Sequence, residues 1–154
     1  MSIESDIKQP SFQSAYHRVV VNVLFTGNWI SNTQLRLLKP FGITMQQYNV
    51  LRILRGKSPC PVKVNEITER MLDRMSNASR LVDKLLAKKL VERTECPNDR
   101  RAVDVVITPK GLALLKKLDL VQSEWEEKLQ EQLTPEQAIL LSQLLDQFRS
   151  SEQQ

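Results

Sequence analysis

Short hydrogen-bonding side chains gather on one face of residues 75–88, near the middle of the chain. At about 100° per residue the apolar side chains of this segment fall on the opposite face, as in an amphipathic helix. Hydroxyl, amide and guanidinium groups on a helix can reach base edges in a DNA major groove, whereas lysine contacts phosphates. The polar residues are Ser76, Asn77, Ser79, Arg80, Asp83 and Lys84, and the apolar ones are Met75, Ala78, Leu81, Val82, Leu85 and Leu86. A solvated helix face is the simpler interpretation when this segment is taken alone.

Two strand-like runs follow this helix, at residues 91–94 and 103–107. The second run alternates apolar and polar side chains, as a half-buried strand requires. Its buried side is expected to consist of Val103, Val105 and Ile107. A Pro-Asn-Asp cluster lies between the runs and favours a turn, so we predict a β-hairpin with a long tip over residues 95–102.

The expected tip carries two adjacent arginines beside a carboxylate. Asp99 can accept bidentate hydrogen bonds from an arginine and hold that side chain extended. An oriented arginine on a projecting ribbon suits a narrow minor groove, where the negative potential is concentrated. We therefore predict that Arg101, oriented by Asp99, enters the minor groove and that Arg100 contacts the DNA backbone.

A short helix predicted over residues 64–71 pairs with the helix over residues 75–88. In such a pair the first helix crosses the DNA backbone and braces the second, which lies in the major groove. With the hairpin beside it, the arrangement is a winged helix-turn-helix. The predicted contacts are to bases for Ser76, Asn77, Ser79 and Arg80, and to phosphates for Arg74 and Lys84.

Several segments of the chain resemble the core pattern of MarR-type transcriptional regulators. These segments are residues 67–71, 79–85, 90–93 and 98–103, and the Thr-Pro-Lys-Gly sequence at 108–111. The resemblance covers about residues 12–149, and it implies a homodimer that binds a pseudo-palindromic DNA operator, most often as a repressor. It also implies release of the DNA by a phenolic or other small ligand, or by oxidation of a cysteine. Many relatives have a glycine in the turn between the two helices, where Leu72, Asp73 and Arg74 stand here, so the start of the second helix is left open by several residues.

Long apolar stripes are predicted on helices at both ends of the chain. The N-terminal stripe over residues 11–38 has more apolar surface than a small domain can cover, and packing against a second subunit would bury it. A helix of some 25 residues after the hairpin and a last helix that ends near residue 149 present the same problem. The last helix is expected to bury Ile139, Leu140, Leu141, Leu144, Leu145 and Phe148. The predicted fold class is mainly α with a small β-hairpin: a winged helix-turn-helix region (44–107) flanked by N-terminal (11–38) and C-terminal (108–149) dimerisation helices.

Capping signals mark where three of these helices begin. Thr44 and Gln47 form a capping box, and Thr134 and Gln137 form another. Thr108 precedes a proline at the first helical position. The helix that starts after Thr44 is expected to end near residue 55 and to bury Tyr48, Val50, Leu51, Ile53 and Leu54. Residues 1–10 are polar and are expected to form a loose arm.

The composition is that of a soluble globular protein of 154 residues with a formal net charge of +4. Residues 1–101 are basic on balance, whereas residues from Glu124 onward carry two basic side chains against seven acidic ones. This asymmetry favours a polyanionic partner at one part of the molecule. We recognise no secretory leader, and no run approaches the roughly 18–20 apolar residues of a membrane span. A cytoplasmic protein with no membrane partner is therefore expected.

Enzymatic chemistry finds little support in this sequence. His17 is the one histidine, and it is more simply a surface or interface residue than a catalytic one. No catalytic triad, metal-spaced His/Cys cluster or glycine-rich phosphate loop can be assembled from the residues present. We therefore expect no catalytic residue, no metal site and no cofactor.

A small aromatic ligand is the favoured regulator. A cleft between the N-terminal helix and the DNA-binding region could hold a flat aromatic acid between aromatic walls and a few polar groups. The candidate residues are Tyr16, His17, Trp29, Tyr48 and Arg52, although each could equally be an ordinary core residue. Oxidation of Cys60 or Cys96 is a less favoured switch, because a redox-sensing thiol needs exposure and a lowered pKa. The alternative to DNA recognition is a winged-helix module that only binds or scaffolds other proteins.

Overall fold

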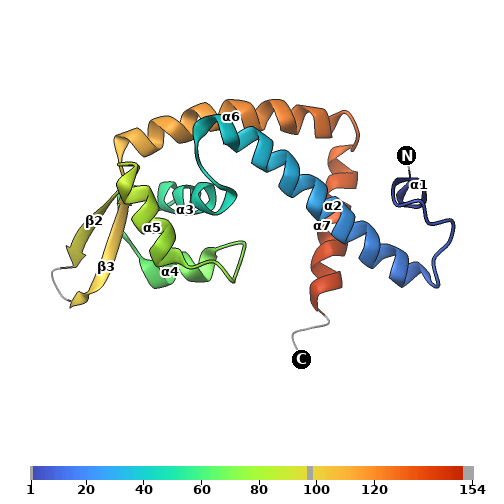
Figure 1. Cartoon of the computed structure of the whole chain (residues 1–154), viewed down its shortest axis with the longest axis horizontal. Helices are drawn as coiled ribbons and strands as arrows, with labels where there is room; N and C mark the ends of the chain where they lie inside the picture. Colours follow the sequence, from blue (N-terminus) through green and yellow to red (C-terminus); the bar gives the residue numbers. More distant parts are fainter. Residues whose placement is uncertain (1, 97–98, 151–154) are drawn as a thin grey trace. The chain divides into compact units, whose positions relative to one another are not determined.

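The computed structural model describes residues 2–96 and 99–150, except for the side chains of residues 95, 96 and 99–103. The chain forms two units, Met1–Gly111 and Leu112–Gln154. Figure 1 shows the elements along the chain. They are α1 (Ile3–Asp6), α2 (Ala15–Leu38), the 3₁₀ turn η1 (Lys39–Phe41), α3 (Met45–Arg55), β1 (Val62–Lys63), α4 (Val64–Arg70), α5 (Ala78–Ala87), β2 (Val91–Cys96), β3 (Asp99–Ile107), α6 (Pro109–Gln130) and α7 (Pro135–Arg149). This mainly helical fold with a small antiparallel sheet confirms the predicted fold class.

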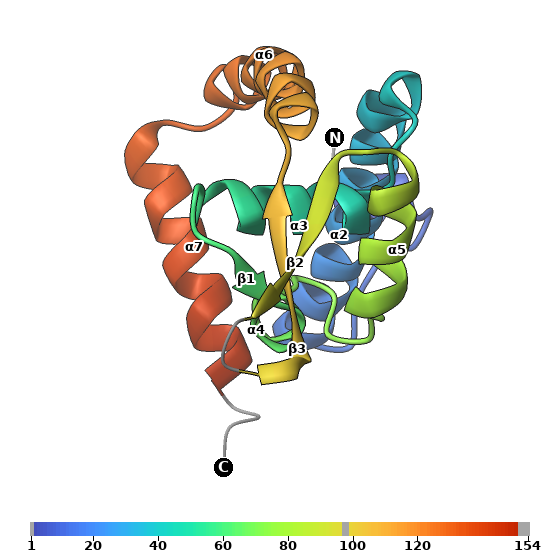
Figure 2. The ribbon, with the colours of Figure 1, turned by 90° about the vertical axis from the view of Figure 1, so that its left-hand side faces the viewer.

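The sheet contains three antiparallel strands in the order β1-β3-β2 (Figure 2). The sequence predicted only the hairpin, because the two-residue β1 is too short to show an alternating pattern. The prediction of a long tip over residues 95–102 is wrong, since β2 runs to Cys96, β3 begins at Asp99, and these two residues pair across the hairpin. The register is irregular between Glu95 and Cys96. Residues 97 and 98 lie outside the described part of the chain.

Helices α3, α4 and α5 pack on one another and on the sheet to form the core of the first unit. The predicted burial of α3 is confirmed at four of its five positions, whereas Tyr48 is half-buried and Gln47 is buried instead. The predicted inward side of the second strand is confirmed for Val105 and Ile107. The buried aliphatic residues of this core include Val50, Leu51, Leu54, Ile67, Val82, Leu85, Leu90 and Val91. Burial of each such side chain contributes about 1.5–3 kcal/mol.

The capping signals begin helices where the sequence placed them. The side chains of Thr44 and Thr134 accept hydrogen bonds from the backbone N–H groups of Gln47 and Gln137, and the glutamine side chains accept from the threonine N–H groups. The Thr108 hydroxyl oxygen accepts a hydrogen bond from the Gly111 N–H at 3.1 Å. Helix α2 begins later than predicted, at Ala15, because the Ser14 side chain caps it.

The N-terminal residues do not form the loose arm that the sequence suggested. They include the short helix α1, whose Ile3 is buried. The Arg18 guanidinium on α2 donates to the Glu4 carboxylate at 2.6 Å. This hydrogen bond is the main reason why the pKa of Glu4 falls to about 2. A buried side chain and an ion pair thus hold a segment whose polar composition hid both contacts.

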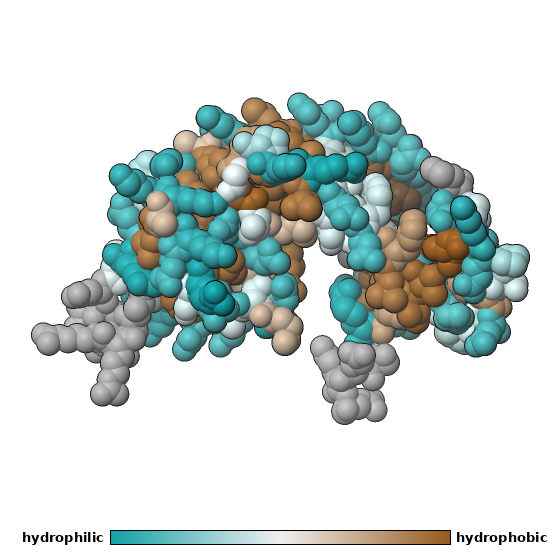
Figure 3. All heavy atoms as spheres, in the orientation of Figure 1, coloured by the Kyte–Doolittle hydropathy of each residue, from teal (hydrophilic) through white to brown (hydrophobic). Residues whose placement is uncertain are grey.

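Two helices expose apolar side chains along their length. On α2 these are Val19, Val20, Leu24, Phe25, Trp29, Ile30 and Leu35, and on α7 they are Ile139, Leu140, Leu141, Leu144 and Phe148. Figure 3 shows apolar surface of this kind in brown. The prediction that α7 buries its apolar residues is not met within one chain, because none of its residues is buried. Among the described helices, none is long and apolar enough to span a membrane.

A close junction joins the end of α5, the sheet and the start of α6. The Thr108 N–H donates to the Leu90 carbonyl oxygen at 3.1 Å, and the Thr108 hydroxyl donates to the Lys89 carbonyl oxygen at 2.9 Å. A β-carbon added at Gly111 would lie 2.3 Å from the Leu90 carbonyl oxygen and 2.7 Å from Cγ1 of Ile107. Only glycine fits here, because the nearest atom is a backbone carbonyl oxygen, which cannot move away as the end of a flexible side chain could.

We predict that Gly111→Ala destabilises the protein by about 1–3 kcal/mol, the usual cost of forcing extra volume into a packed site. Urea unfolding followed by circular dichroism measures this change. Gly27→Ala is the matched control, since a β-carbon at Gly27 in α2 meets nothing within 4 Å and alanine favours a helix. Equal stability of Gly111→Ala and the parent protein would contradict the close junction.

Candidate nucleic-acid interface

Helix α5 begins at Ala78, three residues later than the sequence pattern suggested. Asn77 is its N-cap, and Oδ1 of Asn77 accepts a hydrogen bond from the Arg80 N–H at 3.0 Å. Ser76 and Asn77 therefore precede the helix and do not lie on its polar face. Met75, predicted on the buried apolar face, is 92% exposed. Asparagine favours caps over helix interiors because its side chain competes for backbone hydrogen bonds, which the apolar periodicity did not show.

Residues 71–77 form a loop between α4 and α5, which we call the inter-helix loop. Asp73 organises it: Oδ1 accepts from the Met75 N–H and Oδ2 accepts from the Ser76 hydroxyl, each at 3.0 Å. These hydrogen bonds, that from the Met75 N–H first, lower the pKa of Asp73. The Leu72 N–H donates to Oδ1 of Asn49 on α3 at 2.9 Å. The loop is thus held both internally and against the core.

Arg74 lies in the middle of the inter-helix loop. Its Nη1 donates to the Glu69 carbonyl oxygen in α4 at 2.6 Å, which directs part of the guanidinium to the end of that helix. An arginine has five N–H donors, so one such bond leaves others for a phosphate. The side chain is exposed, as a phosphate contact requires.

The polar face of α5 is exposed at Ser79, Arg80, Asp83 and Lys84. Asp83 accepts a short hydrogen bond from Arg93 of β2, and the two side chains form an ion pair. The side chains of Arg93 and Asp83 are 45% and 59% exposed, so the pair adds little stability, but it connects α5 directly to the hairpin. The sequence analysis did not single out Arg93. Opposite charges at residues 83 and 93, on two elements joined by a short turn, were the available signal.

The predicted wing residues Asp99, Arg100 and Arg101 lie at the start of β3. Their backbone is part of the strand, but their side chains lie outside the described part of the structure. The orientation of Arg101 by Asp99 accordingly remains a prediction.

The structure does not bring the five predicted ligand-binding residues together. Tyr16 and Trp29 are thirteen residues apart on α2, which puts them about 20 Å apart along the helix axis. Tyr16 is 85% exposed, and His17 packs edge-on against Phe12 with ring centroids 5.6 Å apart. Tyr48 and Arg52 do meet, one helical turn apart on α3. Nη1 of Arg52 donates to the Tyr48 hydroxyl oxygen at 3.0 Å, and the guanidinium carbon lies 5.7 Å from the ring centroid.

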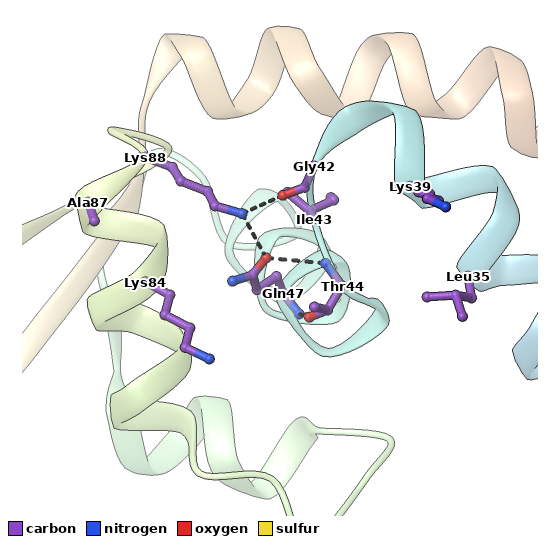
Figure 4. A pocket seen from close by; sticks show the side chains of 9 residues that line it. All are labelled: Leu35, Lys39, Gly42, Ile43, Thr44, Gln47, Lys84, Ala87 and Lys88. Atoms are coloured by element: carbon purple, nitrogen blue, oxygen red, sulfur yellow. Dashed lines mark hydrogen bonds between the residues drawn. The ribbon is translucent and has the colours of Figure 1, made fainter.

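A cavity of about 590 Å³ lies between the end of α2, the start of α3 and the last turns of α5 (Figure 4). It is lined by Leu35, Lys39, Gly42, Ile43, Thr44, Gln47, Lys84, Ala87 and Lys88. The Lys88 ammonium donates to the Gly42 carbonyl oxygen and, at 3.2 Å, to Oε1 of Gln47. None of the five predicted ligand-binding residues lines this cavity. Lys84 in α5 and Lys88 at its C-cap are four residues apart, and this spacing was the sequence signal for the basic wall of the cavity.

The remaining chemistry of the described residues is sparse. No group of three or more His, Cys, Asp or Glu side chains is placed to hold a metal ion within the described part of the chain. Cys60 is an exposed free thiol. The side chain of Cys96, the other predicted redox candidate, lies outside the described part of the structure.

These elements, a helix pair followed by a hairpin, define a winged helix-turn-helix protein. The family model that matches the chain is that of the MarR family, over residues 41–102. The multiple antibiotic resistance protein MarR of Escherichia coli K12 is 32% identical over 110 residues, which are 70% of this chain and 74% of that protein. The regulator PapX of E. coli is 24% identical over 127 residues, which cover 82% of this chain and 77% of PapX.

Solved structures agree with this assignment. A MarR transcription factor from Planctomyces limnophilus superposes with a TM-score of 0.67 at 29% identity, over 88% of this chain and 98% of that one. A mutant of E. coli MarR in complex with operator DNA gives a TM-score of 0.68 at 25% identity, over 88% and 99% of the two chains. The chain belongs to the MarR family of winged-helix transcriptional regulators.

We predict that Asn77→Ala lowers the free energy of unfolding by about 0.5–2 kcal/mol, because the variant loses the acceptor that caps α5. Thermal or urea unfolding measures the loss. Asn77→Asp is the matched control, since its carboxylate keeps an acceptor at the same place and suits the positive end of the helix. If both variants were as stable as the parent protein, the cap would have no role in α5.

Proposed function

We propose that two copies of this chain form a homodimer that binds a pseudo-palindromic operator and represses transcription. The observation that carries the proposal is the physical connection of three DNA-facing parts. The inter-helix loop, which the Asp73 hydrogen bonds hold in place, leads into α5, and the Asp83–Arg93 pair connects α5 to the hairpin. The operator complex of the related E. coli MarR mutant supports DNA as the partner. The repressor MdtR of Bacillus subtilis, 35% identical over 82 residues, supports repression rather than activation.

The proposed major-groove contacts come from the start of α5 and the loop before it. Ser79 and Arg80 are exposed on the helix and can reach base edges with hydroxyl and guanidinium groups. Asn77 uses its side-chain oxygen as a cap, so its amide N–H₂ group is the part available to DNA. Ser76 shares its hydroxyl with Asp73, which limits it to accepting a hydrogen bond from a base. We assign phosphate contacts to Lys84, one turn further along α5, and to Arg74 of the inter-helix loop.

The hairpin supplies the second contact. We assign Arg101 to the minor groove, Asp99 to its orientation and Arg100 to the DNA backbone. A minor groove with strong negative potential favours an arginine, which keeps its charge at all physiological pH values.

The apolar faces of α2 and α7 are the proposed dimer interface. Each face leaves large aliphatic and aromatic side chains exposed in a single chain. Burial of such surface against a second copy is the main driving force for obligate dimers. A twofold dimer would present two copies of α5 about 34 Å apart, one helical turn of DNA, and so require an inverted repeat.

We predict that Arg101→Ala weakens binding to the operator by about 1–3 kcal/mol, or roughly 5- to 150-fold, because a specific contact is lost. Gel-shift titration at fixed salt on a duplex selected from a randomised pool measures the change. Arg149→Ala is the control for loss of one positive charge, since Arg149 lies at the end of α7 and pairs with Asp146.

Full affinity of Arg101→Ala would refute the minor-groove role. A single half-site should bind the parent protein far more weakly than the inverted repeat. Binding with no sequence preference, or none near physiological salt, would overturn the proposed function and favour the protein-interaction module.

The proposal includes release of DNA by a small aromatic acid. The cavity beside α5 combines apolar walls from Leu35, Ile43 and Ala87 with ammonium groups, which suits a flat ring that carries a carboxylate. Both Lys84 and Lys88 line this cavity from the side of α5 (Figure 4). A carboxylate bound there would compete with a DNA phosphate for Lys84. Occupancy of the cavity would thereby weaken DNA binding.

We predict that salicylate lowers operator affinity of the parent protein and that Lys39→Gln reduces this response while it leaves affinity without salicylate unchanged. Lys39 lines the cavity but has no assigned DNA contact. Lys57→Gln is the matched control, because Lys57 is exposed and pairs with Glu66 away from the cavity lining. Fluorescence anisotropy with labelled operator measures both quantities. Unaltered affinity of the parent protein in salicylate would reject this ligand class.

A further inference from the structure

Two large apolar side chains stand almost fully exposed on the inter-helix loop. Leu72 is 88% exposed and Met75 is 92% exposed. Both lie in the segment that leads into α5, and neither belongs to the apolar faces of α2 and α7. Exposure of such a side chain forgoes the roughly 1.5–3 kcal/mol that its burial would contribute. A role in contact with another molecule would explain why apolar residues stand here.

The backbone around these two residues is held in place. The Leu72 N–H donates to Asn49 on α3, and the Met75 N–H donates to the Asp73 carboxylate. Asp73 also accepts from the Ser76 hydroxyl. The loop therefore does not need to be ordered when a partner binds, which lowers the entropic cost of the contact.

The surroundings of the two residues indicate the partner. Arg74 lies between them in the chain, Arg70 precedes them at the end of α4, and Arg80 lies in the first turn of α5. The carboxylate within the loop, that of Asp73, is occupied by hydrogen bonds from within the protein. Apolar groups among cations suit a partner that combines phosphates with a few apolar groups. Arg70 already pairs with Glu66, but a purely apolar protein surface would offer no anion to Arg74 and Arg80.

Duplex DNA has one such apolar group on its major-groove edge, the C5-methyl group of thymine. In a helix-turn-helix protein the residues at the start of the second helix face the base edges. We propose that Met75 and Leu72 contact thymine methyl groups and thereby make the operator prefer A·T pairs opposite the start of α5. This inference rests on the proposed function and adds a specificity determinant to it.

The test replaces single thymines of the selected operator by deoxyuridine, which removes the methyl group and keeps the base-pairing edge. At the contacted position the parent protein should lose about fourfold in affinity per half-site, the value of one buried methyl group. Met75→Ala and Leu72→Ala are titrated against the same duplexes. For a contacting residue, the difference between thymine and deoxyuridine should shrink to less than twofold in the alanine variant.

Two further variants sharpen the result. Met75→Leu should retain the preference for thymine, since it keeps an apolar side chain of similar volume. Leu120→Ala removes an exposed apolar residue on α6 and should leave the preference for thymine over deoxyuridine unchanged. Circular dichroism checks that the variants fold, which we expect because the exposed side chains of Leu72 and Met75 contribute little to the core.

Loss of the thymine preference in either loop variant supports the contact at that residue. The inference is overturned if no thymine position responds to deoxyuridine, or if the response is the same in Met75→Ala, Leu72→Ala and the parent protein. In both of these cases selective operator binding would remain, so the proposed function would stand. Absence of selective binding by the parent protein would instead overturn the proposed function itself.

Discussion

The junction of Lys89, Leu90, Thr108 and Gly111 is the constraint on which the DNA-binding unit depends. There the Thr108 backbone and hydroxyl donate to two successive carbonyl oxygens at the end of α5, and the missing β-carbon of Gly111 lets α6 begin against the same backbone. Lys89 takes a left-handed conformation with φ of 59°, which costs a non-glycine residue about 1–2 kcal/mol. Lys110 adds a hydrogen bond to the Lys88 carbonyl oxygen at 2.9 Å. Because α5, β2, β3 and α6 all meet here, the junction fixes the position of α5 relative to the β2–β3 hairpin.

Polar side chains decide how the other end of α5 is presented. Asp73, Asn77 and Asn49 satisfy backbone N–H groups of the inter-helix loop and of the first helical turn. Their hydrogen bonds end the loop at a defined residue and leave the donors of Ser79, Arg80 and Lys84 facing outward. The same bonds hold the backbone of Leu72 and Met75. Specific recognition of a rigid duplex needs such preorganisation, since a mobile loop would pay an ordering cost with each contact.

The chain separates two kinds of surface, and each suits a different partner. Apolar side chains are exposed on α2 and α7, where burial against a second copy gains free energy in proportion to area. Cations are concentrated in the basic N-terminal two thirds, where attraction to phosphates is long-ranged and depends on salt. Acidic residues dominate beyond Glu124, and they disfavour a nucleic acid at that end. In the proposed dimer, this division keeps the dimer interface and the DNA-binding surface from competing with each other.

Local patterns in the sequence determined the helices and strands whose cause is itself local. The capping boxes of Thr44 and Thr134 and the alternation that buries Val105 each act within a few residues, so the sequence shows them directly. Tertiary structure alone decided the third strand, the docking of α1 and the attachment of the inter-helix loop to α3. Each of these depends on contacts between distant residues: Val62 with Val105, Glu4 with Arg18, and Leu72 with Asn49. Periodicity records which side chains are apolar, but only the folded chain determines which distant hydrogen-bonding partner is within reach.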